Sequence, residues 1–148
     1  MDRMEHTKTT VPSMDAWIKE AKEDKSAPEC GMYLFHNGIV RQSARAKVRQ
    51  GDISASDVKG MVFSYDKEKV EEAVENTQNM PGIGWSCRCN RDFRFGRVRV
   101  WLNEGQLEVG DDIMLVLVGG DIRPHVVDAL QSLVGELKNH CVKEEELF

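Results

Sequence analysis

The amino-acid sequence predicts an α+β fold, in which a mixed or antiparallel sheet carries helices packed on one face. After a short N-terminal helix, segments with strand and helix patterns follow in the order β, β, α, β, β, α. The chain has 148 residues, of which 41% are hydrophobic and 30% charged, and this composition suits one domain with a hydrophobic core. We expect residues 1–12 to form a flexible N-terminus and residues 13–148 to form the domain.

The first predicted elements are a short helix and a strand. The sequence SMDAWIKEAKED has Ser13 in the position of an N-cap and directs Trp17 and Ile18 inward. After the break at APEC, the sequence GMYLFHNGIVR is rich in apolar and aromatic side chains, which predicts a strand over residues 31–41.

A basic segment separates this strand from the next one. Residues 42–57 (QSARAKVRQGDISASD) have no apolar periodicity, so we expect a long flexible loop, and loops of that length are often functional. VKGMVFSYD then predicts a strand over residues 58–66. The helical spacing in residues 67–78 (KEKVEEAVENTQ) places four side chains on one buried face: Val70, Ala73, Val74 and Thr77.

The second half contains two strands and a long helix. Residues 96–102 (GRVRVWL) alternate strictly, which predicts a half-buried strand with its valines inward and its arginines and tryptophan outward. Two glycine-containing turns follow in NEGQLEVGDD. The segment IMLVLVGG, residues 113–120, is nearly all apolar, as in a strand buried on both faces. Residues 123–140 show helical spacing of apolar side chains, with Pro124 in the first turn.

The charge is unevenly distributed along the chain. The net charge is −5, which argues against a dedicated nucleic-acid-binding protein. Residues 41–49 nevertheless contain four basic side chains and no acidic one, and residues 87–99 contain five arginines and one aspartate. A basic patch on an acidic protein suits a small anionic substrate or an acidic partner. Two solvated basic loops remain the simpler alternative.

The sequence also bears on location and redox state. It contains no run of about 18 to 20 apolar residues, the length that a membrane-spanning helix needs. The segment MDRMEHTKTT lacks the apolar core of a signal peptide. We therefore expect no membrane association, a cytoplasmic location, and reduced thiols at Cys30, Cys87, Cys89 and Cys141.

Residues 96–145 resemble the large, catalytic subunit of molybdopterin synthase. A strand leads in that family into a Gly-x-Leu-x-x-Gly-Asp turn, matched here by Gly105, Leu107, Gly110 and Asp111. A buried strand, a short loop with an arginine, and a long helix ending in Leu-Lys follow in both, with a second lysine beyond. The upstream NGIVR resembles the family's Gly-x-Val-Arg, so the resemblance extends over residues 30–146.

The resemblance implies an α/β hammerhead-type fold and a specific reaction. Members form a homodimer, and each protomer binds a ubiquitin-like sulfur-carrier small subunit that ends in Gly-Gly, giving a heterotetramer. The thiocarboxylated tail of the carrier enters a pocket of the large subunit. Two sulfurs are transferred onto cyclic pyranopterin monophosphate, forming the dithiolene of molybdopterin. The resemblance implies no metal and no cofactor in this step.

By position, Lys138 and Lys143 correspond to two lysines of the family and are the candidate catalytic residues. A lysine supplies a fixed charge for the anionic tail and phosphate and, when partly desolvated, an acid or base. Side chains five residues apart point about 140° from each other on a continuous helix. A shared site therefore requires the helix to end near residues 139–141. The alternative is a pair of ordinary surface lysines near a helix C-terminus.

Four arginines are candidate anion-binding residues. Arg123 matches the family's arginine in the loop before the long helix, and Arg41 matches the arginine that ends the early strand. Arg45 and Arg49, together with Lys47, are candidates for a basic lid over the substrate phosphate. An ordinary solvated loop is the alternative for this lid.

Three departures from the family pattern keep a second function open. Leu102 and Asn103 stand where the family carries His-Arg, and Ile122 stands where a histidine precedes the loop arginine. The tail after the second lysine is also short. The alternative function is a non-catalytic dimeric paralogue that binds a carrier tail or a pterin.

The cysteines suggest a third possibility, a zinc-stabilised interaction domain. Two cysteines in WSCRC and the His-Cys pair in NHC contain the ligand types of a structural zinc site. The candidate ligands are Cys87, Cys89, His140 and Cys141. A role of the paired thiols in sulfur handling is a further alternative, and ordinary reduced cysteines without such a role are the simplest interpretation.

Overall fold

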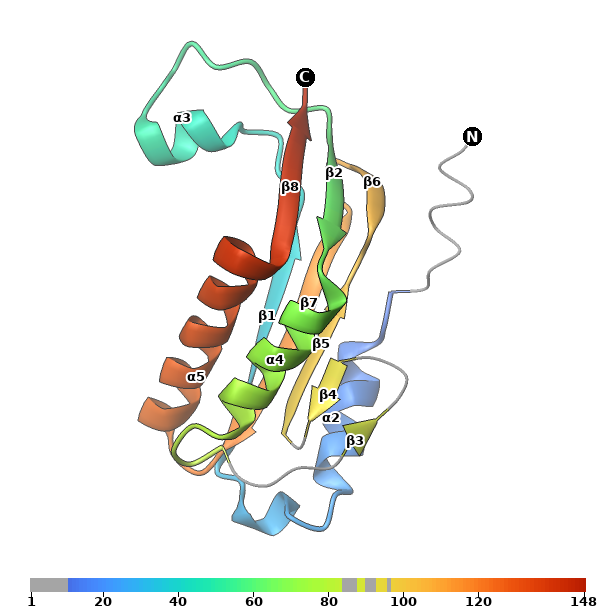
Figure 1. The fold of residues 1–148 in the computed structure, drawn as a ribbon, viewed down its shortest axis with the longest axis vertical. Coiled ribbons are helices and arrows are strands. Elements are labelled where there is room, and N and C mark those ends of the chain that lie inside the picture. The colour runs from blue at the N-terminus through green and yellow to red at the C-terminus, as the bar shows by residue number, and fades with distance from the viewer. Residues whose placement is uncertain (1–10, 84–87, 90–92, 96) are drawn as a thin grey trace.

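The computed structural model describes residues 11–83, 88–89, 93–95 and 97–148, with side chains described outside residues 84–96. Two antiparallel sheets form its frame (Figure 1). The five-stranded sheet has the order β1 (Met32–Ile39), β7 (Asp112–Gly120), β5 (Val98–Leu102), β4 (Phe93–Phe95) and β3 (Arg88–Cys89). The three-stranded sheet has the order β6 (Gly105–Glu108), β2 (Gly60–Tyr65) and β8 (Val142–Leu147).

Helices cover both faces of the five-stranded sheet. Two of them, α4 (Lys67–Gln78) and α5 (Arg123–Glu136), pack on one face and enclose the main core with Val98, Val116 and Val118. On the opposite face, α2 (Met14–Lys22) buries Trp17 against Trp101 and Leu115. The predicted α+β class is therefore confirmed, and α2 adds a second covering layer.

The cover provided by α2 corrects one prediction. β5 is not half-buried, because every residue from Val98 to Leu102 is buried. Arg99 remains only 8% exposed, because its guanidinium lies 4.5 Å from the centre of the Trp17 ring and 2.9 Å from a carboxylate oxygen of Glu20. A cation on a strand face is stabilised here by an aromatic ring and an ion pair from the same helix.

The starts of α2 and α5, the buried side of α4 and the burial of β7 agree with the predictions. The Ser13 hydroxyl accepts a hydrogen bond from the Ala16 amide at 3.2 Å and caps α2. All four predicted inward side chains of α4 are buried, and β7 is buried along nearly its whole length. α5 begins at Arg123, with Pro124 in its first turn. Amphipathic periodicity thus predicted these elements correctly.

The segment 42–57 is not a continuous loop. It contains α3 (Arg45–Gln50), followed by the 51–57 turn segment, and Gly51 ends the helix with a φ of 71°. No side chain next to α3 caps it; instead, a carboxylate oxygen of Glu146 on β8 accepts a hydrogen bond from the Arg45 amide at 2.9 Å. The cap comes from 101 residues away, which explains why local sequence did not predict this helix.

Four short strands were also not predicted: β3 and β4, which lie in the second basic segment, and β6 and β8. β6 lies within the segment NEGQLEVGDD, which we expected to form two turns, and β8 lies in the C-terminal sequence VKEEEL. Both pair with β2, whose Met61 faces Leu107 on one side and Glu146 on the other. The pairing is long-range, and neither strand has the apolar alternation of an isolated sequence signal.

Candidate functional site

The turn between α5 and β8 organises the C-terminal part of the molecule. After α5, a π turn (η2, Leu137–Cys141) leads directly into β8. Leu137 and Cys141 anchor the turn, being 0% and 4% exposed, and the Cys141 carbonyl accepts a hydrogen bond from the Asp66 amide at 2.8 Å. The helical path therefore ends between Lys138 and Lys143, as the spacing argument required.

Lys138 lies on this turn, close enough to His36 of β1 to affect its charge. Burial, and next the positive charge of Lys138, lower the pKa of His36 below the ordinary histidine value. The His36 Nε2 atom is buried and has no hydrogen-bond partner among the described residues. Lys138 itself is exposed, so its ammonium group is available to a ligand.

Lys143 occupies the second position of β8, opposite Ser64 of β2. Its side chain is 75% exposed, and its ammonium nitrogen lies 3.7 Å from a Glu145 carboxylate oxygen. Because side chains alternate along a strand, Glu144 and Glu146 point to the other face of β8. The two lysines therefore lie on different elements at the same end of α5.

The predicted basic lid lies beside β8 (Figure 1). The Arg45 Nη2 atom is 2.9 Å from the Glu144 Oε1 atom. Arg41 is exposed, and its Nε atom donates a hydrogen bond to the Ser43 carbonyl at 2.9 Å. Arg49 is exposed in the last turn of α3. Arg45 is thus held by an acidic side chain, whereas Arg41 and Arg49 present their charge to solvent.

Arg123 lies at the opposite end of α5. Fifteen residues separate it from Lys138, which is about 22 Å along a helix. Within one chain, Arg123 therefore does not lie next to Lys138. In the same turn, the His125 Nδ1 and Asp121 Oδ1 atoms are 2.7 Å apart, and this hydrogen bond lowers the pKa of the Asp121 carboxyl group.

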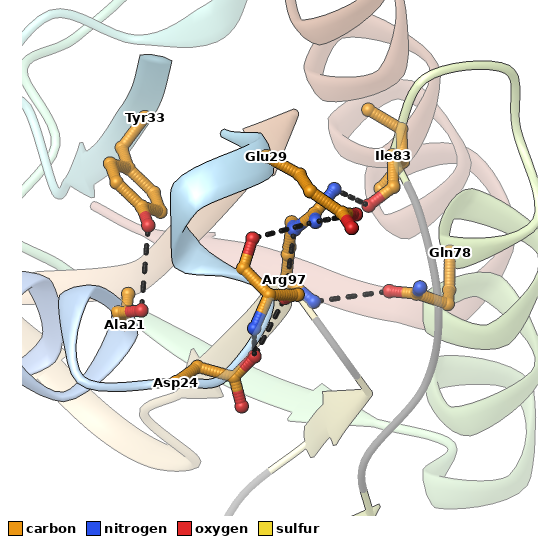
Figure 2. Close-up of polar contacts among 8 residues, drawn as sticks. Ala21, Asp24, Glu29, Tyr33, Gln78, Ile83 and Arg97 are labelled. Carbon is orange, nitrogen blue, oxygen red and sulfur yellow. Dashed lines mark hydrogen bonds and ion pairs between the residues drawn. The ribbon is translucent and has the colours of Figure 1, made fainter. Parts of the chain in front are cut away.

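Two arginines of the second basic segment are structural. The Arg97 guanidinium donates hydrogen bonds to the Ser26 and Ile83 carbonyls at 3.0 and 3.2 Å, and also contacts Glu29 (Figure 2). The Arg97 side chain is only 7% exposed, and Arg99 is buried beneath Trp17. These two residues do not contribute to a basic surface patch; the other three arginine side chains of the segment lie outside the described residues.

The proposed zinc ligands are only partly described. Cys87 and the side chain of Cys89 lie outside the described residues. His140 is exposed and its Nδ1 atom lies 3.2 Å from Glu136, while Cys141 is buried, which raises the pKa of its thiol. Within the residues that the structure describes, no three His, Cys, Asp or Glu side chains are grouped as metal ligands would be.

Two of the three positions that depart from the family pattern, Leu102 and Asn103, are buried, and the third, Ile122, is exposed. Leu102 and Asn103 are 6% and 4% exposed, and the Asn103 Nδ2 atom donates a hydrogen bond to the Asp112 carbonyl at 2.9 Å. Ile122 is 52% exposed just before α5. Leu102 is therefore part of the main core, and Asn103 links the end of β5 to the start of β7. The Asn103 Oδ1 atom is buried and has no hydrogen-bond partner among the described residues.

Sequence reasoning did not identify two acidic residues of this region, Glu144 and Glu146. Both contact Arg45 from the C-terminal strand, across 99 and 101 residues of sequence. The only local signal was the alternation of their carboxylates with Lys143 and Glu145 in KEEE.

In the described part of the chain, no helix has the length and apolar character needed to cross a membrane.

Comparison with known proteins gives one family and one fold. The model of the family described as "MoaE protein" matches residues 8–140. Among solved structures, molybdopterin synthase from Staphylococcus aureus is similar, with a TM-score of 0.64 and 12% identity over 93% of this chain and 86% of that one. The MoaE protein from Burkholderia ambifaria MC40-6 has a TM-score of 0.61 and 15% identity, covering 92% and 82%.

A third similar structure contains two kinds of subunit. It is the complex of subunits 1 and 2 of molybdopterin-converting factor from Helicobacter pylori 26695, with a TM-score of 0.59 and 13% identity over 91% of this chain and 78% of that one. At these identities the structural likeness shows a shared fold. No curated protein is similar enough in sequence to count as a match.

Proposed function

Because this chain belongs to the MoaE family, the catalytic subunit family of molybdopterin synthase in molybdenum cofactor biosynthesis, we propose that it is a sulfur transferase. Its substrates are the thiocarboxylated tail of a ubiquitin-like carrier and cyclic pyranopterin monophosphate. The product is the molybdopterin dithiolene. The end of the helical path between the two candidate lysines, which a shared site requires, is the observation that supports this proposal most directly.

The proposed chemistry assigns different roles to the two lysines. Lys138 exchanges protons with the oxygen leaving groups, because its ammonium group is exposed on the turn that ends α5 and is available to a ligand. Lys143 is a fixed charge for the anionic tail, held on a strand and next to Glu145. The transfer needs both functions, since the carrier tail and the substrate phosphate are anions.

The arginines of this region bind the substrate phosphate in our proposal. Arg41 and Arg49 are exposed, and they lie on the segment that begins at the end of β1 and passes beside β8. A guanidinium group binds phosphate through paired hydrogen bonds. Arg123 lies about 22 Å from Lys138 along α5. We assign it to an anion that binds at the other end of this helix.

The proposed partner is a small carrier subunit that ends in Gly-Gly. The Helicobacter pylori structure, which contains two subunits of molybdopterin-converting factor, supports a partner of this kind. We further propose that residues 13–148 act as one domain, that two chains form a homodimer within a heterotetramer, and that the protein works in the cytoplasm.

The test is a reconstituted reaction with the full chain, a thiocarboxylated carrier and cyclic pyranopterin monophosphate. Formation of the dithiolene product supports the proposed function. If the carrier binds and no product forms, the protein is instead a non-catalytic binding paralogue. That second candidate is favoured by one observation, the burial of Leu102 and Asn103 at positions where the family carries His-Arg.

A further inference from the structure

The C-terminal strand holds the basic segment by two acidic side chains on one of its faces. We propose that Glu144 and Glu146 are positioning residues, which fasten α3 to β8 so that Lys47 and Arg49 meet the phosphate of the substrate. Arg45 serves in this arrangement as the attachment point and does not bind the phosphate. The inference rests on the proposed function and deepens it, because it divides the basic lid into an anchor and a ligand-binding part.

Arg45 is attached to β8 by two contacts. Glu146 accepts a hydrogen bond from the Arg45 main-chain amide, and Glu144 pairs with the Arg45 guanidinium, each at 2.9 Å. The Glu144 side chain is 14% exposed, so this pair is shielded from water on the carboxylate side. A charge-assisted contact with low exposure is stronger than an ordinary surface ion pair. The Arg45 guanidinium, 41% exposed as a side chain, is therefore already paired with a carboxylate before any ligand arrives.

The rest of α3 differs from its first residue. Lys47 and Arg49 are exposed, and neither has an ion pair with any other described residue. No side chain between Arg45 and Gln50 is buried, so packing alone does not hold the helix against the body. Apart from the buried Ala44 that directly precedes it, the helix is held by the two glutamates, while Lys47 and Arg49 remain available to an anion.

The attachment lies next to the proposed catalytic region. Glu144 directly follows Lys143 on β8, and strand alternation places the two side chains on opposite faces. The attachment of α3 and the exposed Lys143 thus lie on consecutive residues of the same strand, on its two faces. In our proposal, β8 is therefore the element shared by the basic segment and Lys143.

The first experiment measures the attachment without any reaction. Amide hydrogen exchange in residues 45–50 is compared between the natural chain, the double variant E144Q/E146Q, and the control Glu71→Gln on the exposed face of α4. We expect faster exchange in α3 for the double variant and no change for the control. Unchanged exchange in the double variant would overturn the anchoring role, whether or not the protein transfers sulfur.

The second experiment separates anchoring from phosphate binding. The Kd for cyclic pyranopterin monophosphate is measured by calorimetry on the same proteins and on the charge-swapped chain R45E/E144R. We expect E144Q/E146Q and, separately, K47Q/R49Q to weaken binding roughly five- to tenfold. The charge swap should restore both the exchange protection and the Kd, since only the attachment of Arg45 matters.

Each outcome of the binding experiment is decisive. A charge swap that restores protection but leaves binding weak would show that the Arg45 guanidinium itself contacts the phosphate, which contradicts the inference. Equal binding by E144Q/E146Q and the natural chain would also contradict it. Binding that weakens as expected in a protein without sulfur-transfer activity would support the inference and overturn the proposed function.

Discussion

At the scale of single residues, Lys138 and His36 form the most informative pair in the molecule. The lysine is exposed on η2, and the histidine is half-buried on β1 with its Nε2 atom unpartnered among the described residues. A buried polar atom without a partner is unfavourable and is often found at functional sites. The pair therefore reports on the electrostatics of the proposed site without requiring any substrate.

Replacing Lys138 by methionine should raise the pKa of His36. The positive charge of Lys138 is the second cause of the lowered value, after burial, so its removal leaves only the burial effect. The measurement is an NMR titration of the histidine side chains. The control Lys67→Met, on the exposed start of α4, should leave the pKa unchanged. An unchanged His36 pKa in the Lys138 variant would show that the two side chains do not interact.

His36 should also make the protein less stable in mild acid. Its folded-state pKa is lowered, so below the ordinary histidine pKa the unfolded chain binds a proton that the folded chain resists. Stability is therefore lost as the pH falls through about 6.5, the unfolded-state value. Urea unfolding of the natural chain and of His36→Phe at pH 7.5 and pH 5.5 checks this. The variant should lose less stability on acidification; an equal loss would exclude His36 as the cause.

At the scale of elements, local sequence predicted the parts that depend on periodicity. The faces of α4, the N-cap of α2 and the burial of β7 follow from spacing and capping alone. The parts that failed depend on distant partners. α3 needs Glu146 from β8, and the buried face of β5 needs Trp17 from α2. Such pairings leave no local signal, because each partner looks like an ordinary polar or aromatic residue.

Arg97 joins three segments and should be important for stability. It connects the start of β5 to the turns around Ser26 and Ile83, and its own amide donates a hydrogen bond to the Gln78 side chain at 3.1 Å (Figure 2). Arg97→Ala leaves the two carbonyls without this donor, so we expect a loss of about 2–3 kcal/mol in the free energy of unfolding.

The same urea unfolding experiment supplies the comparison for Arg97. Arg97→Lys should recover only part of the loss, because an ammonium group does not reproduce the planar fork of donors. Lys19→Ala, on the exposed side of α2, serves as the control. If Arg97→Ala unfolds at the same urea concentration as the control, these hydrogen bonds contribute nothing measurable.

At the scale of the whole molecule, the two lysines and the basic segment lie at one end of α5, and Arg123 lies at the other. The helical path ends between the two lysines, as a shared site requires. The division of the arginines was not predictable: Arg45 is paired with a glutamate 99 residues away, and Arg97 and Arg99 are buried. Sequence charge alone does not distinguish an exposed cation from a buried one.

The proposed assembly gives a prediction at this scale. Sedimentation should yield twice the chain mass of 16.8 kDa, and a heavier complex with two carriers per dimer when the small subunit is added. A monomer at all concentrations, with and without carrier, would contradict the assembly.

The role of Lys138 in sulfur transfer is the central claim, and a single-turnover reaction tests it most directly. Thiocarboxylated carrier and cyclic pyranopterin monophosphate are mixed with excess natural chain, Lys138→Ala or the control Lys67→Ala, and dithiolene formation is followed over time. We predict product with the natural chain and the control, and a rate at least about a hundredfold lower with Lys138→Ala. Equal rates for Lys138→Ala and the natural chain would contradict the claim.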